Sequence, residues 1–269
     1  LAALLQLLAM FQSPLTGLSG VQSQLAAVRA AEARLDELYS LPGEASGQAA
    51  EEDDVFRAIV FENVTFSYEG EEQPVLRNFS ARLPLDRWTC LTGMSGSGKS
   101  TIIKAVMGLL GNEGMVTEGD IWYKGKNVVD MPEKELRRLL GPEIAMVFQD
   151  SGAALCPIRT VGDQIYESMR EHERISRKEC AERAVRMMAK IGLKDGERVL
   201  QSYPFELSGG MNQRVGICIS MLQNPSLLLA DEPTSALDVT VQKQVVEEML
   251  LMREEYGTAM IVVTHNIGV

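Results

Sequence analysis

The chain is poor in histidine, cysteine and positive charge, and each shortage excludes a class of protein. Its 269 residues include only two histidines and four cysteines, and no C-x-x-C pair occurs. The spacing of metal ligands therefore cannot be built from them. Lys plus Arg total 26 against 37 Asp plus Glu, which gives a net charge of -11. Because binding to a phosphate backbone requires clustered positive charge, we expect no nucleic-acid partner.

The chain also has no long apolar run and no sign of disorder. Hydrophobic residues make up 45% and charged residues 23% of the sequence, which is typical of a soluble globular protein. The apolar run 1–11 is shorter than the roughly 20 residues that a membrane-spanning helix needs, so it is either a short buried helix or the tail of a longer one. The cysteines are expected to be small buried residues with reduced thiols, which fits a cytosolic location; they are Cys90, Cys156, Cys180 and Cys218.

The sequence pattern divides the chain into three segments. Apolar residues between 18 and 38 recur at spacings of three, four and seven, which predicts one helix within residues 1–41. Small residues and an acidic run at 42–54 predict a flexible linker. From 55 to 269 the chain alternates strand-like and helix-like segments, which predicts an α/β domain with a parallel, helix-covered sheet.

Several local signals mark elements within this domain. Short runs of β-prone residues at 58–61 and 64–68 predict strands. Ser176, with Glu179 three residues later, forms a capping box that predicts the start of a helix. The apolar run 259–263 predicts a buried strand.

A glycine-rich motif occupies residues 93–100 and predicts a nucleotide site. It matches G-x-x-x-x-G-K-[ST], follows the strand-like 89–92 and precedes the helix-prone 101–110. Its glycines let backbone N–H groups turn toward phosphates, and the helix N-terminus adds partial positive charge. Lys99 would neutralise phosphate charge and the Ser100 hydroxyl would ligate Mg²⁺. The residues assigned to this part of the site are Gly93, Ser95, Gly96, Ser97, Gly98, Lys99, Ser100 and Thr101.

A second motif supplies two carboxylates. The apolar run 227–230 predicts a buried strand that ends in Asp231 and Glu232. Ligands of open parallel sheets bind at the carboxyl ends of the strands. Asp231 is therefore placed to hold the Mg²⁺ shell, and Glu232 to orient or deprotonate the water that attacks the γ phosphate. This predicts hydrolysis as well as binding.

The two motifs are far apart, because Asp231 follows Lys99 by 132 residues, much more than one βαβ crossover needs. The intervening chain contains Leu207-Ser208-Gly209-Gly210-Met211-Asn212-Gln213-Arg214. Ser208 can cap the helix that follows and also present its hydroxyl to a phosphate.

Together these motifs resemble the nucleotide-binding domains of ATP-binding cassette (ABC) transporters, a P-loop NTPase fold with a parallel-sheet core and an inserted helical subdomain, here at about 150–225. The resemblance runs from about 59 to 269. It implies a head-to-tail dimer in which the signature of one subunit closes over the γ phosphate held by the other. The signature residues are Ser208, Gly209 and Gly210.

The resemblance also assigns roles to single residues. Tyr68 would stack on adenine, and Gln149 would link the metal and the attacking water to the transmembrane partner. Asp238 would lie at the dimer interface, and His265 would contact the γ phosphate. Met211 stands where glutamine is commonest in the signature, a change that looks normal for one branch of the family.

Two branches of the family are represented. Residues 92–269 look like the ATP-binding subunits of oligopeptide, dipeptide and nickel importers, whereas residues 1–85 look like the end of an exporter transmembrane domain and the start of its nucleotide-binding domain. The changeover falls at about 84–89. The chain stops four residues after His265, where the family continues, so we expect a domain truncated at its C-terminus.

The resemblance implies ATP and Mg²⁺ as cofactors, a second nucleotide-binding domain and transmembrane permease subunits or domains as partners, and a place at the cytoplasmic face of the cell membrane. Three alternatives to an importer-like motor stay open. They are an exporter half-transporter motor, a non-transport ABC ATPase that clamps DNA or ribosomes, and a P-loop kinase. The acidic balance and the short insert disfavour the clamp, and a kinase would not need Ser208 or His265.

Overall fold

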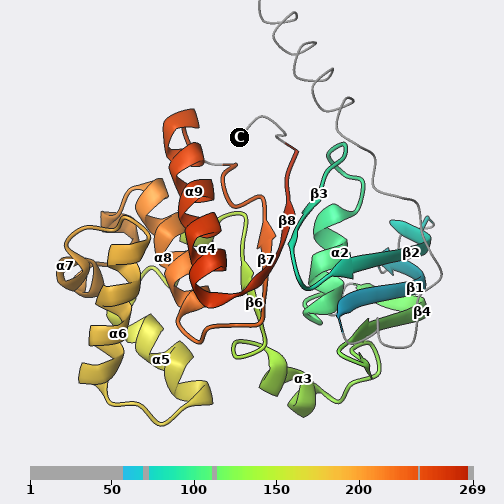
Figure 1. The fold of residues 1–269 in the computed structure, drawn as a ribbon, viewed down its shortest axis with the longest axis horizontal. Coiled ribbons are helices and arrows are strands. Elements are labelled where there is room, and N and C mark those ends of the chain that lie inside the picture. The colour runs from blue at the N-terminus through green and yellow to red at the C-terminus, as the bar shows by residue number, and fades with distance from the viewer. Residues whose placement is uncertain (1–56, 69–72, 111–113, 236, 266–269) are drawn as a thin grey trace, which may run out of the picture. The chain divides into compact units, whose positions relative to one another are not determined.

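The structure is a computed structural model that describes residues 57–68, 73–110, 114–235 and 237–265, so the predicted helix at 1–41 and the linker at 42–54 lie outside it (Figure 1). The elements follow in the order β1 (Ala58–Tyr68), β2 (Leu76–Pro84), β3 (Trp88–Leu91), α2 (Lys99–Val106), β4 (Gly114–Tyr123), β5 (Lys126–Asn127), α3 (Glu133–Leu139), β6 (Ile144–Val147), α4 (Ser151–Ala154), α5 (Val161–His172), α6 (Arg177–Lys190), α7 (Gly196–Gln201), a 3₁₀ turn (Pro204–Glu206), α8 (Gly209–Met221), β7 (Leu227–Asp231), α9 (Val239–Tyr256) and β8 (Ala259–Val263).

The described strands form two sheets rather than one. The parallel sheet has the order β3-β8-β7-β6, and an antiparallel sheet has the order β2-β1-β4-β5. The sequence predicts the parallel sheet but not the antiparallel one, because β1 pairs with β4, about 50 residues further along the chain. The β1–β2 and β4–β5 pairings join consecutive strands, and the β4–β5 connection is a two-residue turn. It has positive φ at Lys124 and Gly125, as a tight hairpin requires.

The two predicted β-prone runs at 58–61 and 64–68 form one continuous strand, β1. The register against both neighbours shifts between them. Asn63 at the shift has a φ of 51°, and Gly119 lies so close that an added Cβ would be 2.3 Å from the Glu62 carbonyl oxygen. The irregularity is therefore a bulge that only a glycine opposite can accommodate.

The parallel sheet lies between two apolar cores. Every residue of β6, β7 and β8 is buried. Since side chains alternate along a strand, Leu228 and Ala230 pack into the core formed with α5, α6, α8 and α9, whereas Leu227 and Leu229 pack into the core formed with α2 and the antiparallel sheet. Burial on both faces explains why β7 is a continuous apolar run.

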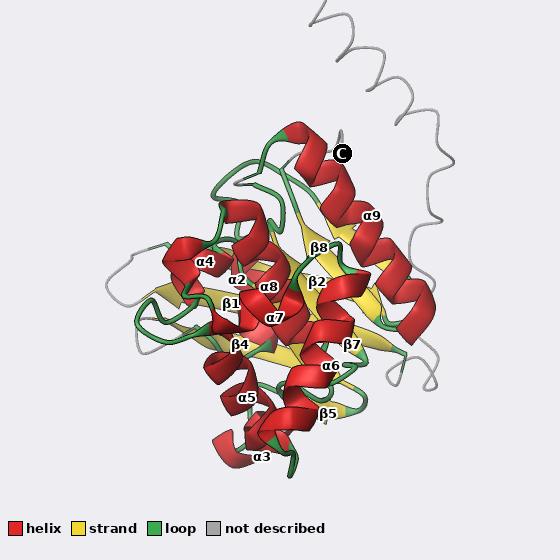
Figure 2. Cartoon of the chain, turned by 90° about the vertical axis from the view of Figure 1, so that its left-hand side faces the viewer, coloured by secondary structure: helices red, strands yellow, loops and turns green. Residues whose placement is uncertain are grey.

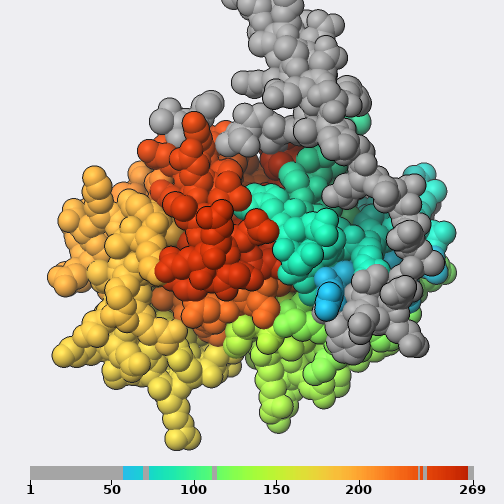
Figure 3. Space-filling view, in the orientation of Figure 1, coloured from blue at the N-terminus to red at the C-terminus, as the bar shows by residue number. Residues whose placement is uncertain are grey.

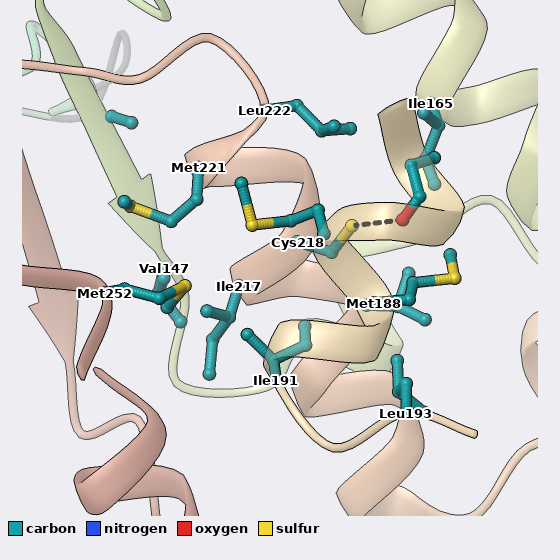
Figure 4. Packing of buried hydrophobic residues seen from close by; sticks show 14 of the residues in the cluster. Val147, Ile165, Met188, Ile191, Leu193, Ile217, Cys218, Met221, Leu222 and Met252 are labelled. Carbon is teal, nitrogen blue, oxygen red and sulfur yellow. Dashed lines mark hydrogen bonds between the residues drawn. The ribbon is translucent and has the colours of Figure 1, made fainter. Parts of the chain in front are cut away.

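The helical core is rich in sulfur. Figure 4 shows Met221 and Cys218 of α8 packed near Met188 of α6, with the Cys218 thiol 3.9 Å from the Ala184 carbonyl oxygen. Burial raises the pKa of the Cys218 thiol. The prediction of buried cysteines is thus right for Cys218 and Cys180, whereas Cys156 is only partly buried. It is wrong for Cys90, which is exposed on β3, an edge strand of the parallel sheet.

Helix boundaries follow their capping residues. Ser176 caps α6, and its hydroxyl accepts a hydrogen bond from the Glu179 N–H at 3.2 Å. The helix predicted at 101–110 is shorter in the structure, where α2 ends at Val106. Gly108, in the left-handed region with a φ of 64°, terminates it as a C-terminal glycine does. Among the described helices, none is long and apolar enough to cross a membrane.

Candidate nucleotide-hydrolysing site

Four of the predicted site segments come together because each follows one of four neighbouring parallel strands. The glycine-rich loop follows β3, His265 follows β8, Glu232 follows β7 and Gln149 follows β6. These four strands are adjacent in one sheet, so the segments after them meet at the same edge, which is where ligands of open α/β sheets bind. Figure 2, turned by 90° from Figure 1, shows this sheet with α9 alongside β8.

Lys99 is the first residue of α2 and is 8% exposed. Its ammonium group donates hydrogen bonds to the carbonyl oxygens of Gly93, at 2.8 Å, and Met94, at 2.7 Å, and lies 3.3 Å from the Ser97 hydroxyl. Gly98, with a φ of 83°, lets the loop turn directly into the helix. The loop thus wraps around a buried positive charge at a helix N-terminus, the arrangement that binds phosphate.

The Ser100 hydroxyl donates a hydrogen bond of 2.7 Å to the Asp231 carboxylate. Asp231 ends the buried strand β7 and is 2% exposed. A hydroxyl oxygen and a carboxylate oxygen are hard ligands of the kind that Mg²⁺ prefers. The described residues contain no cluster of three or more His, Cys, Asp or Glu side chains that could bind a metal alone. Such a pair instead suits Mg²⁺ that reaches the protein with a phosphate substrate.

Glu232 is held from both sides. The Gln149 amide donates to one of its carboxylate oxygens at 3.1 Å, and Nδ1 of His265 lies 2.9 Å from the other. The backbone of Glu232 has a φ of 45°, which costs about 1–3 kcal/mol for a residue with a side chain. The Glu232 N–H donates to the Val263 carbonyl oxygen at 2.9 Å, so the neighbouring strand holds this conformation.

One cavity of about 530 Å³ connects these groups. Its lining comes from the loop and α2, from the cluster around Glu232 and from the region of the antiparallel sheet. The lining residues are Tyr68, Val75, Ser95, Gly96, Gly98, Lys99, Ser100, Thr101, Gln149, Glu232 and His265. The Tyr68 ring packs edge-on against Phe66, with centroids 4.9 Å apart, and is 38% exposed. An exposed aromatic face beside a phosphate loop can stack on a base.

Val75 lines this cavity although the sequence does not predict it there. No motif includes it, because it reaches the site only through pairing of the antiparallel sheet, where its N–H donates to the Phe66 carbonyl oxygen at 2.8 Å.

The sequence model of the ABC transporter family matches residues 76–235. The chain belongs to the ABC transporter family. A dipeptide transport ATP-binding protein, DppD of Lactococcus lactis, is 36% identical over 208 residues, which cover 77% of this chain and 60% of that protein. An oligopeptide transport ATP-binding protein, OppD of Bacillus subtilis, is 39% identical over 207 residues, which cover 77% of this chain and 58% of that protein. The cassette thus spans about three fifths of the length of these relatives.

The likeness to importer proteins extends beyond the predicted changeover at 84–89. A match to 77% of the chain is a larger share than residues 92–269 make up, so the match includes residues before 92, in the part of the chain that holds β1, β2 and β3. Among solved structures, a dimeric ATP-binding cassette in a post-hydrolysis state, bound to ADP and Pi, has a TM-score of 0.69 at 29% identity, over 78% of this chain and 88% of that one.

In this ABC cassette the signature residues and Asp238 lie outside the cavity. Ser208 caps α8, and its hydroxyl accepts a hydrogen bond from the Met211 N–H at 3.3 Å. The Asp238 carboxylate accepts one from the Val241 N–H at 3.2 Å, at the start of α9. Within one chain, therefore, the structure brings the loop, Tyr68, Gln149, Glu232 and His265 together but not the signature.

Gly98 offers a test of how tightly the loop packs on the antiparallel sheet. An added Cβ at Gly98 would lie 2.8 Å from the Leu76 side chain, in a backbone with a φ of 83°. We expect Gly98→Ala to lower the free energy of unfolding by about 1–3 kcal/mol and to weaken ATP binding, measured by urea denaturation and nucleotide titration. Gly257→Ala is the control, since Gly257 has a φ of 67° but no atom within 4 Å of the added Cβ. Equal losses in both variants would contradict the packing argument.

Proposed function

We propose that this cassette is the ATP-hydrolysing motor of an ABC transporter and that it works as a head-to-tail dimer. The observation that carries the proposal is the Glu232 carboxylate, held by Gln149 and His265 in the same cavity as the buried Lys99 of the glycine-rich loop. A cassette that only bound nucleotide would not need a carboxylate oriented from both sides beside the phosphate loop.

In the proposed reaction, Lys99 and the N–H groups of the loop hold the β and γ phosphates, and Tyr68 stacks on the adenine. Glu232 accepts a proton from the water that attacks the γ phosphorus, while the bond to the β-phosphate oxygen breaks and ADP and phosphate leave. His265 keeps the carboxylate oriented and approaches the γ phosphate. Gln149, which follows β6, responds to the occupant of the cavity through its contact with Glu232.

Ser100, Asp231 and Gln149 would hold Mg²⁺ together with the phosphates. The hydroxyl–carboxylate pair at 2.7 Å supports this assignment, because both oxygens are hard ligands. When bound, the ion neutralises charge that develops on the phosphate oxygens.

The dimer is supported by what the cavity lacks. Ser208, Gly209 and Gly210 do not line it, yet Ser208 presents a hydroxyl at the N-terminus of α8, where an anion is favoured. A second subunit would place these residues over the γ phosphate of the first, with Asp238 at the interface. A solved cassette with the same fold and bound ADP and Pi is a dimer.

We further propose that the motor serves an importer of the peptide or nickel type, at the cytoplasmic face of the membrane, with permease subunits docked over the insert between Gln149 and Ser208. The names of the dipeptide and oligopeptide transport relatives support this choice. The alternative is an exporter half-transporter, as the resemblance of the residues that precede the importer-like match suggests.

The proposal is tested by measuring phosphate release from ATP with Mg²⁺ and with excess EDTA. We expect release that depends on Mg²⁺, that rises with protein concentration as dimers form, and that is unaffected by duplex DNA. Transfer of the γ phosphate to a small molecule would instead support a kinase, and tight duplex DNA binding at physiological salt would support a clamp.

A further inference from the structure

An ion pair joins α8 to α9. Arg214 donates from Nε to the Glu248 carboxylate at 3.0 Å and from a terminal nitrogen to its other oxygen at 3.1 Å. The same guanidinium lies 3.4 Å from the Gln244 amide oxygen. The side chains of Arg214 and Glu248 are only 12% and 15% exposed. A bidentate, shielded pair of this kind has a defined geometry, in contrast to an exposed pair.

The two helices that it joins carry the segments proposed to face the second subunit. Arg214 is one turn from Gly210 in α8, the helix capped by Ser208. Glu248 and Gln244 lie on the same side of α9 as Val241, at helical spacings, and the N–H of Val241 is bonded to Asp238. The pair therefore links the signature segment to the Asp238 segment through two rigid helices.

The ends of these helices also touch directly. A Cβ added to Gly210 would lie 3.3 Å from the Val241 side chain and 3.8 Å from that of Leu237, so the signature packs against the first turn of α9. Beside the ion pair, Gly192 leaves room for Glu248, since a Cβ added to Gly192 would lie 2.6 Å from a Glu248 oxygen. Figure 3 shows α9, in red, beside the orange and yellow helices on this face of the cassette.

We infer that Arg214 and Glu248 are positioning residues that keep the signature segment, 208–210, in register with Asp238, so that both reach the nucleotide of the second subunit together. This inference rests on the proposed function and adds to it a specific mechanical link. Neither residue lines the cavity of its own subunit. Their effect on hydrolysis is therefore exerted on the partner's nucleotide and not on their own.

Arg214→Gln should separate binding from turnover. We expect the affinity of the chain for a fluorescent ATP analogue to change by less than about twofold, and kcat for phosphate release to fall at least about tenfold, because the signature no longer closes in the correct register. Arg214→Lys, which keeps the charge but not the bidentate geometry, should recover part of the rate. Arg137→Gln, which removes an exposed pair with Glu133, is the matched control and should leave both quantities unchanged.

Mixed dimers of two differently tagged copies locate the defect. With Lys99→Met disabling one copy, phosphate release comes from the loop of the other. Arg214→Gln should lower this release when it is on the disabled copy, whose signature serves the active loop, and should have little effect on the active copy. Equal loss on either copy, or parallel loss of ATP binding, would overturn the inference.

A second variant distinguishes unfolding of the cassette from a misplaced signature segment. If Arg214→Gln lowers the midpoint of thermal unfolding below the assay temperature, Glu248→Gln, which is isosteric and keeps an acceptor for the guanidinium, replaces it and must show the same asymmetry. If the unchanged chain releases no phosphate, the proposed function fails. If the unchanged chain releases phosphate but Arg214→Gln has the same effect on either copy of the mixed dimer, only the positioning role of Arg214 and Glu248 fails.

Discussion

Replacing Glu232 by Gln is expected to lower the rate of ATP hydrolysis by about 100-fold or more, the usual size of the contribution of a general base, while nucleotide affinity stays close to that of the unchanged chain. The amide has nearly the same shape and can still accept a hydrogen bond from Gln149. It cannot accept the proton of the attacking water. Phosphate release and ATP titration measure the two effects separately, and size-exclusion chromatography with ATP should show a trapped dimer.

Glu247→Gln is the control for this experiment. Glu247 is exposed and its contact with Lys243 is 3.8 Å long, so the replacement changes the net charge equally without touching the site. Full turnover by the Glu232→Gln variant would mean that another group accepts the proton, and the assignment of the base would then be wrong.

The second large effect is expected from Lys99→Met. This change removes the buried ammonium group that lies within 2.8 Å of two carbonyl oxygens of the loop. Because a charge-assisted hydrogen bond to phosphate contributes about 1.5–3 kcal/mol, we expect ATP affinity to fall about 10- to 100-fold and hydrolysis to be lost. Isothermal titration with ATP measures the affinity directly.

Lys104→Met provides the matched comparison, since Lys104 is on the same helix, α2, but does not line the cavity. It should bind ATP as the unchanged chain does. If Lys99→Met retains full affinity, the glycine-rich loop binds phosphate through its backbone N–H groups alone, and the role assigned to the lysine is incorrect.

The residues around Glu232 differ in whether a local sequence pattern predicts their role. The motif at 93–100 and the strand before Asp231 are local patterns, and each could be interpreted without knowing the fold. Gln149 and His265 have no such signal, being 83 and 33 residues away from Glu232. Only the family resemblance predicts them, and both lie within hydrogen-bonding distance of the carboxylate in the structure.

The sequence by itself determined the local features: the phosphate loop with its positive-φ glycines, the buried strands β7 and β8, and the helix that starts after Ser176. These features depend on backbone sterics, side-chain caps and the burial of neighbouring residues, and all of these are set by residues close together in the sequence. Only the tertiary structure decided that an antiparallel sheet brings Tyr68 and Val75 to the loop, and that Arg214 meets Glu248, 34 residues away. Such pairings depend on which distant segments bury the same apolar surface, and that is a property of the whole fold.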